Sequence, residues 1–218
     1  MQDLLLLPRR FCVVLAVLAV SALSAKAQTF SNPTPIIIPD SGAASPYPSN
    51  IVVSGVGTVP GLTLSLFNMN HTFPDDIDIL LVGPTGATLL LMSDTGGSLD
   101  IVGVNLTFMD GAPALPDTTQ ITSGTYSPTN YPGLLGAGDT FPAPAPAPPY
   151  GTTLSVFNGT NGNGTWSLYV FDDEAADLGN IGGGWSLTIV PEPSAFALFG
   201  GGALVLTLAA WKRRARSS

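Results

Sequence analysis

Two groups of closely spaced carboxylates are the residues of this sequence that could do chemistry. Their members are Asp75, Asp76 and Asp78 in the first group, and Asp172, Asp173, Glu174 and Asp177 in the second. A calcium ion takes about six to eight oxygen ligands from carboxylates, amide oxygens and backbone carbonyls, and flexible acidic loops supply such ligands. In a strand, Asp76 and Asp78 would point to the same side and could share one ion. We therefore predict calcium as a cofactor, held by these residues.

The middle of the chain offers these carboxylates no Lys or Arg partner. All seven basic residues lie before residue 28 or after residue 211, whereas 13 of the 15 acidic residues, all but Asp3 and Glu192, lie between residues 28 and 191. Proteins hold a phosphate backbone with Lys and Arg side chains, so this distribution excludes nucleic acid as a partner. The alternative to calcium is that the carboxylates are solvated and keep an exported domain soluble.

Enzymatic chemistry has little support in the residue types. His71 is the only histidine, and no Gly-x-Ser-x-Gly turn supplies an activated serine for a Ser-His-Asp site. The only cysteine, Cys12, lies in the N-terminal leader described next. We therefore expect a protein that is not an enzyme and has no catalytic residue. A glycoside hydrolase remains a third possibility, because that reaction needs only paired carboxylates.

Residues 1–27 have the pattern of a signal peptide. Two arginines precede an apolar run over residues 11–23, and the small residues Ala25 and Ala27 stand where signal peptidase reads them. We expect this enzyme to cleave before Gln28, so the domain is exported. A retained N-terminal anchor is the alternative, although about 13 apolar residues are short for a membrane span.

The C-terminal end resembles the PEP-CTERM sorting signal of Gram-negative bacteria. It consists of Pro191, Glu192 and Pro193, an apolar run over residues 195–211, and a basic tail with Arg213 and Arg214. The run is long enough for a transmembrane helix whose basic end stays in the cytoplasm. The resemblance implies processing by an exosortase-class enzyme, release to the cell surface or exterior, and an association with exopolysaccharide. An unprocessed membrane anchor is the alternative.

Between the two ends, short apolar or alternating runs predict about nine strands, separated by glycine and proline turns. We place them at residues 36–38, 50–59, 62–69, 77–82, 88–92, 102–108, 152–157, 166–171 and 185–190. This pattern predicts an all-β fold, an antiparallel jelly-roll β-sandwich over residues 28–190. Trp166 and Trp185 are expected in neighbouring strands, and the proline-rich stretch of residues 141–150 as an extended surface arm.

Several segments of the domain resemble, in order, the proprotein convertase P domain, a jelly-roll sandwich that follows subtilisin-like proteases. They read HTFPDDIDILLVGPTG over residues 71–86, FNG and GTWSL over residues 157–168, and DLGNI and GWSL over residues 177–187. The resemblance implies that His71 caps a strand end by hydrogen bonds. We expect no protease domain before the sandwich, which would depart from the convertase arrangement.

Together these patterns predict three parts: a signal peptide at 1–27, a P-domain-like sandwich at 28–190, and a sorting signal with a transmembrane helix at 191–218. We expect a surface-sorted, calcium-stabilised structural or adhesive protein of the cell exterior or its polysaccharide matrix. The alternative is a carbohydrate-binding module on the same fold, which exposed tryptophans would favour.

Overall fold

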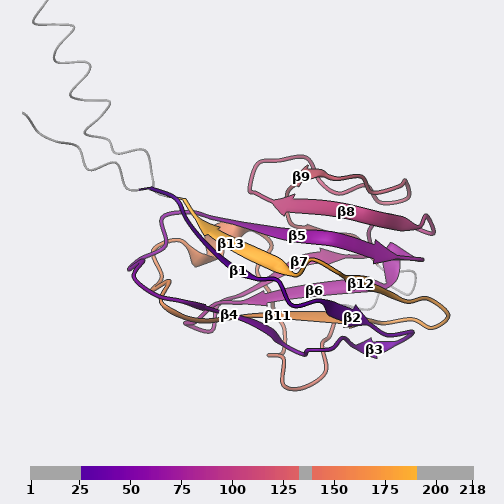
Figure 1. Cartoon of the computed structure of the whole chain (residues 1–218), viewed down its shortest axis with the longest axis horizontal. Helices are drawn as coiled ribbons and strands as arrows, with labels where there is room; N and C mark the ends of the chain where they lie inside the picture. Colours follow the sequence, from indigo (N-terminus) through magenta and orange to yellow (C-terminus); the bar gives the residue numbers. More distant parts are fainter. Residues whose placement is uncertain (1–25, 133–138, 191–218) are drawn as a thin grey trace, which may run out of the picture. The chain divides into compact units, whose positions relative to one another are not determined.

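The computed structural model describes residues 26–132 and 139–190, which fold into two β-sheets that pack against each other (Figure 1). The seven-stranded sheet contains β1 (Gln28–Asn32), β13 (Trp185–Ile189), β5 (Leu62–His71), β12 (Gly179–Ile181), β2 (Ile36–Ile38), β8 (Ile101–Phe108) and β9 (Gly124–Tyr126). The six-stranded sheet contains β10 (Thr129–Asn130), β7 (Thr88–Ser93), β6 (Ile77–Val82), β11 (Gly164–Asp172), β3 (Gly42–Ala43) and β4 (Ser49–Val53). Two short 3-10 helices, η1 (Pro74–Asp76) and η2 (Leu154–Phe157), complete the described elements. The prediction of an all-β sandwich is confirmed.

Most strand pairs are antiparallel, as predicted, but two short pairings are parallel. These join β10 to β7 and β9 to β8. The short polar strands were not predicted, because their residues lack the apolar alternation that marks a half-buried strand. Strand β1, for example, reads QTFSN and is largely exposed on the edge of its sheet.

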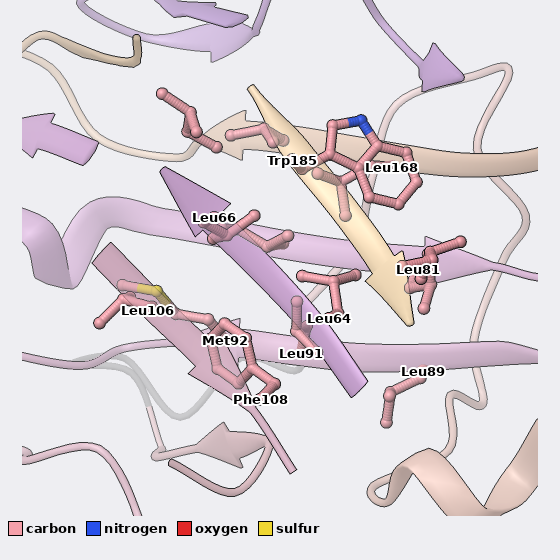
Figure 2. Packing of buried hydrophobic residues seen from close by; sticks show 14 of the residues in the cluster. Leu64, Leu66, Leu81, Leu89, Leu91, Met92, Leu106, Phe108, Leu168 and Trp185 are labelled. Atoms are coloured by element: carbon pink, nitrogen blue, oxygen red, sulfur yellow. The ribbon is translucent and has the colours of Figure 1, made fainter. Parts of the chain in front are cut away.

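The core lies between the sheets and is built by alternation along the long strands. In β5 the side chains of Leu62, Leu64 and Leu66 are buried, while the residues between them are more exposed. Figure 2 shows how Leu64 and Leu66 lie among leucines of the opposite sheet, including Leu81 and Leu168. Each such side chain contributes about 1.5–3 kcal/mol when it leaves water, so this domain needs no disulfide to hold its two sheets together.

The two tryptophans lie in opposite sheets, and the prediction that their strands are neighbours is wrong. Trp166 is in β11 and Trp185 is in β13, and the chain between them crosses from one sheet to the other. Both side chains are fully buried. Their indole N–H groups donate to the carbonyl oxygen of Gly162 at 3.0 Å and to Ser49 Oγ at 2.9 Å. Both residues therefore serve the core, which removes the exposed tryptophans that would have favoured a carbohydrate-binding module.

The segment predicted as a strand at residues 152–157 forms helix η2 instead. Its first turn is held by Asp110, whose two carboxylate oxygens accept hydrogen bonds from the backbone N–H groups of Leu154 and Ser155, each at 2.8 Å. A side chain 44 residues earlier thus satisfies two donors at the helix start. No local pattern in the sequence indicates this remote partner.

The proline-rich arm, residues 141–150, packs on the outer face of the six-stranded sheet. Phe141 joins Leu80, Leu90 and Tyr169 in a second buried cluster, and Tyr150 packs against it. Most of the arm's prolines are exposed, while Phe141 is 9 % exposed. The arm is therefore a cover for an apolar sheet face as well as a connection.

The predicted signal peptide, the sorting residues Pro191, Glu192, Pro193, Arg213 and Arg214, and the predicted transmembrane helix lie outside the described residues, apart from the end of the leader. Of the leader, only Lys26 and Ala27 are described. Among the described residues, no helix has the length and apolar character needed to cross a membrane.

Candidate metal centre

Three aspartates meet at one end of the six-stranded sheet. Each of Asp78, Asp94 and Asp139 offers a carboxylate oxygen that lies within 4.8 Å of the oxygens offered by the other two. Asp78 belongs to β6, Asp94 follows β7, and Asp139 precedes the proline-rich arm. Residues distant in the sequence are thus gathered into one carboxylate cluster.

Local backbone structure explains how these side chains reach the same place. Ile77 and Ile79 of β6 point into the core between the sheets, so Asp78 points to the outer face of its sheet. Asp94 follows the last residue of β7 and has a φ of 51°. This left-handed conformation is one that aspartate tolerates better than most residues, and it turns the chain out of the strand.

Ser93 lies at the centre of the cluster and cannot satisfy all of it. Its hydroxyl oxygen is 2.9 Å from Asp94 Oδ2 and 2.9 Å from Asp139 Oδ1. A hydroxyl carries one proton and can donate it to only one of these oxygens. At the other contact, the lone pairs of the hydroxyl oxygen and the carboxylate oxygen repel each other unless a carboxyl group is protonated or a cation lies nearby. Asn130 supplies one further donor, from Nδ2 to Asp139 Oδ2 at 2.8 Å.

The electrostatics of the cluster favour a bound positive charge. Asp78 is only 4 % exposed, and burial raises its pKa to about 8 against the opposing hydrogen bond of Ser93, with a smaller increase from the charge of Asp139. Burial likewise raises the pKa of Asp94 to about 6. No Lys or Arg occurs in residues 28–190. At neutral pH the cluster must therefore hold a proton or a cation that the domain does not itself provide.

The ligands on offer suit a hard divalent cation. Three carboxylates and the Ser93 hydroxyl are all oxygen donors, and the cluster contains no imidazole or thiol. Oxygen-only sites are typical of calcium and magnesium, whereas zinc and copper sites use nitrogen and sulfur donors. Such an ion would connect β6, the end of β7 and the start of the proline-rich arm.

The structure brings only Asp78 of the seven sequence-predicted ligands into this cluster. Among residues 26–132 and 139–190, it is the one such group of three or more metal-ligating side chains. The remaining six are distributed around η1 and the loop after β11: Asp75 and Asp76 lie in η1, Asp172 ends β11, and Asp173, Glu174 and Asp177 follow it. Asp76 and Asp78 do not share one side of a strand, because β6 begins only at Ile77.

Asp94 and Asp139 were missed by the sequence reasoning. Each is an isolated aspartate in its own segment. The two lie 45 residues apart in the chain, and no spacing rule connects them. The available signal was the short polar pair Ser93-Asp94 at the end of the apolar strand β7. Only the docking of the proline-rich arm on the sheet brings Asp139 to it.

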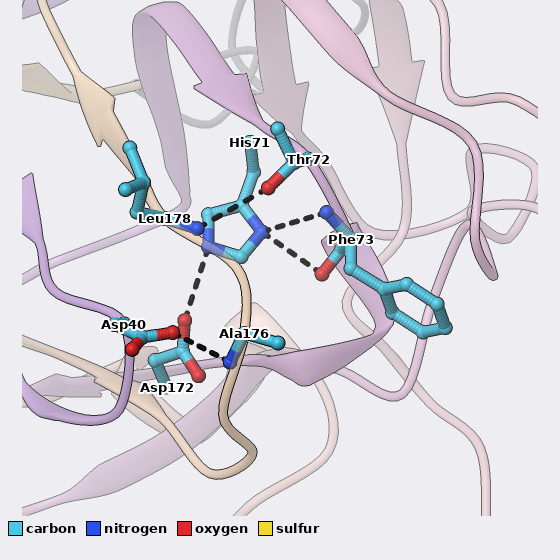
Figure 3. A network of polar contacts seen from close by, with 7 residues as sticks. All are labelled: Asp40, His71, Thr72, Phe73, Asp172, Ala176 and Leu178. Carbon is cyan, nitrogen blue, oxygen red and sulfur yellow. Dashed lines mark hydrogen bonds and ion pairs between the residues drawn. The ribbon is translucent and has the colours of Figure 1, made fainter.

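Asp172 instead forms a buried pair with His71 between the two sheets (Figure 3). His71 Nε2 lies 3.1 Å from Asp172 Oδ2, and both side chains are fully buried. The other ring nitrogen, Nδ1, lies 2.9 Å from the carbonyl oxygen of Phe73. Burial lowers the pKa of His71, against the opposing effects of the Phe73 carbonyl and Asp177. His71 is the last residue of β5, and Asp172 is the last residue of β11, so the pair joins the sheets at one end of the core.

Comparison with known proteins identifies the C-terminal segment. Residues 190–214 match the PEP-CTERM protein-sorting motif. The predicted sorting signal is thereby confirmed, and the roles of Pro191, Glu192, Pro193, Arg213 and Arg214 within it stay predictions. The motif indicates an exported, surface-sorted protein and implies processing by an exosortase.

Part of the chain is also similar to a protein named as an enzyme, and two solved structures show a weak likeness to the chain. The chain is 40 % identical over 74 residues to leupeptin-inactivating enzyme 1 of Streptomyces exfoliatus. The aligned stretch is 34 % of this chain and 17 % of that enzyme. Crystal structures of the Aeromonas sobria serine protease, alone and with its chaperone, are 16 % identical, with TM-scores of 0.34 and 0.36. Each match covers 76 % of this chain and 26 % of the protease. The chain thus spans less than a third of the length of each relative.

The sequence match corrects the expectation that the chain is not an enzyme, because the protein that shares the 74 residues is named as an enzyme. That expectation rested on residue types missing from the sequence, such as a second histidine or an activated serine, and a missing motif does not define the class of a protein.

Proposed function

We propose that this protein is an exported, surface-sorted β-sandwich that binds one calcium ion at Asp78, Asp94 and Asp139 and works in the same extracellular setting as secreted peptidases. The observation that carries the calcium proposal is the arrangement around Ser93. One buried hydroxyl proton faces two carboxylate oxygens at 2.9 Å, with a third carboxylate beside them and no Lys or Arg in the domain.

Calcium fits this cluster better than magnesium does. Calcium accepts irregular coordination by six to eight oxygens, roughly, whereas magnesium demands near-ideal octahedral geometry and keeps most of its water. Asp78 lies in β6, Asp94 directly follows the neighbouring strand β7, and Asp139 comes from a separate segment. Such an irregular set of ligands favours the more tolerant ion. When bound, the ion would supply the positive charge that lets all three carboxylates be ionised together. Its mechanical effect would be to fasten the start of the proline-rich arm to the sheet.

The link to peptidases rests on the segments that resemble a P domain, which follows subtilisin-like proteases, and the sequence match adds a protein named as an enzyme. The 74 residues shared with leupeptin-inactivating enzyme 1 are 40 % identical, which is well above what a common sandwich architecture alone requires. We infer that the sandwich corresponds to a P-domain-like part of such enzymes. The sorting motif would hold it at the cell surface, where it has a structural or adhesive role beside peptidase action.

Isothermal titration of calcium into the full-length chain, freed of metal with a chelator, tests the proposal. We expect one ion per chain, with magnesium binding more weakly. Asp139→Asn is expected to abolish the binding heat, whereas Glu174→Gln, which changes an exposed carboxylate of the loop after β11, leaves it unchanged. Loss of binding in the Glu174 variant but not in the Asp139 variant would place the ion in that loop and refute the assignment.

A further inference from the structure

A pocket of about 690 Å³ opens beside the carboxylate cluster. It lies between the segment around β10 and the end of the proline-rich arm, with Leu90 of β7 among its lining residues. Its volume falls in the range of about 300–1,000 Å³ that is usual for small-molecule sites. The residues that line it are Leu90, Ala114, Pro128, Thr129, Asn130, Tyr131, Asp139, Thr140, Pro148, Tyr150, Gly151 and Thr152.

The lining is amphipathic, with aromatic and apolar walls and polar groups from a few residues. Tyr131 and Tyr150 each use their hydroxyl group in a hydrogen bond to a backbone carbonyl, so their contribution to the pocket is the body of the ring. The polar groups include Asp139 and the side-chain amide of Asn130, which are hydrogen-bonded to each other. A ligand that suits this pocket needs an apolar face and several hydroxyl or amide groups.

Charge narrows the class of ligand further. The domain contains no Lys or Arg, and three ionised aspartates with one calcium ion leave a net charge of about −1, so the site disfavours a phosphate, sulfate or carboxylate group. With calcium on the three aspartates, the pocket would also lack a free carboxylate strong enough to hold an organic cation. What remains is a neutral, polyhydroxylated ligand.

We propose that this pocket binds a neutral saccharide, whose ring packs on Tyr131 or Tyr150 and whose hydroxyl groups contact Asn130 and the calcium ion beside Asp139. Sugar rings have one apolar C–H face and a rim of hydroxyls, which matches tyrosine walls with a carboxylate and an amide nearby. Asp139 belongs to both the pocket and the carboxylate cluster, so the two sites meet at one residue. This inference rests on the calcium site of the proposed function.

The test is titration of the full-length chain with neutral tetrasaccharides of glucose, mannose and galactose, in calcium and again in a chelator. Thr152→Trp places a large side chain in the pocket from an exposed position, and Thr119→Trp is the matched control on an exposed residue away from it. We expect saccharide binding in calcium to weaken about tenfold or more in Thr152→Trp and in the chelator. The Thr119 variant is expected to bind like the wild type.

Each other outcome is decisive. Saccharide binding that survives Thr152→Trp, or binding of a lysine-containing or proline-rich peptide with no saccharide binding, refutes this inference. Calcium binding without any saccharide binding refutes the saccharide site and leaves the proposed function standing. A chain that binds neither calcium nor saccharide refutes both.

Discussion

Without calcium, the free energy of unfolding is expected to fall as the pH rises from 5 to 8. The oxygens of Asp78, Asp94 and Asp139 lie within 4.8 Å of one another. Two unit charges at this separation repel by about 3.5 kcal/mol when the effective dielectric constant is about 20, so three ionised carboxylates would cost about 10 kcal/mol. Whole domains are stable by about 5–15 kcal/mol. The metal-free cluster must therefore keep at least one proton to remain folded.

The sign of the effect follows from the direction of the pKa shift. Burial raises the pKa of Asp78 from 3.8 to about 8 in the folded protein. The folded state thus keeps a proton that the unfolded state loses near pH 4. The stabilisation that this proton gives to the folded state disappears as the pH rises through 8. One proton changes the free energy of unfolding by about 1.4 kcal/mol per pH unit, which gives about 4 kcal/mol between pH 5 and pH 8.

Urea denaturation in a chelator, at several pH values, measures this change in the wild type and in Asp78→Asn. The variant keeps the shape of the side chain and removes its charge. We therefore expect its free energy of unfolding to fall less between pH 5 and pH 8 than that of the wild type, with a difference of up to about 4 kcal/mol. Burial and nearby carboxylates also raise the pKa of Asp76 to about 7, so some dependence on pH remains in both proteins. The difference between them is the quantity that reports on Asp78.

Calcium provides the second half of this experiment. An ion at about 100 times its dissociation constant stabilises the folded state by about 2.7 kcal/mol. At pH 8 we expect this stabilisation in the wild type and in Asp100→Asn, which alters an exposed aspartate outside the cluster. Asp78→Asn is expected to show little of it. Equal pH dependence and equal calcium response in wild type and Asp78→Asn would refute the reasoning.

Three further substitutions test the packing that positions the site. His71→Ala leaves the buried Asp172 without its hydrogen-bond partner and is expected to lower the free energy of unfolding by about 1–3 kcal/mol. A loss below about 0.5 kcal/mol in urea denaturation would contradict a buried pair. Asp110→Ala removes the acceptor for two N–H groups of η2 and is expected to cost about 0.5–2 kcal/mol, with Asp117→Ala as an exposed control. Phe141→Ala is expected to cost about 3 kcal/mol and to lower the melting temperature measured by circular dichroism, because it removes the ring that buries the proline-rich arm. No change in melting temperature would show that the arm is not docked.

The fold class and the long strands could be predicted from the sequence because alternation is a local signal. Leu62, Leu64 and Leu66 alternate with polar residues, and this pattern alone places one face of β5 in the core. The same rule placed Asp78 on the side of β6 opposite Ile77 and Ile79. Elements held by distant partners were not accessible in this way. The 3-10 helix at residues 154–157 depends on Asp110, which no local pattern connects to it.

The metal centre could be predicted only in part for the same physical reason. A group of neighbouring carboxylates is visible in a sequence, but its members can point to different sides of the fold. Asp172 turns inward to His71, while Asp78 turns outward to meet Asp94 and Asp139. The partners of Asp78 come from segments that are brought together by the docking of the arm. Sequence spacing carries no information about such a docking.

Residues 141–150 cover the outer face of the six-stranded sheet, and this cover affects whether the protein self-associates at high local concentration. Leu80, Leu90 and Tyr169 would form an exposed apolar strip if the cover lifted, and such strips lead proteins to self-associate. Asp139 lies two residues before Phe141, so the proposed ion fastens the cover close to its anchoring ring. The calcium concentration outside the cell would then determine whether molecules of this protein, crowded at the cell surface, remain separate or self-associate.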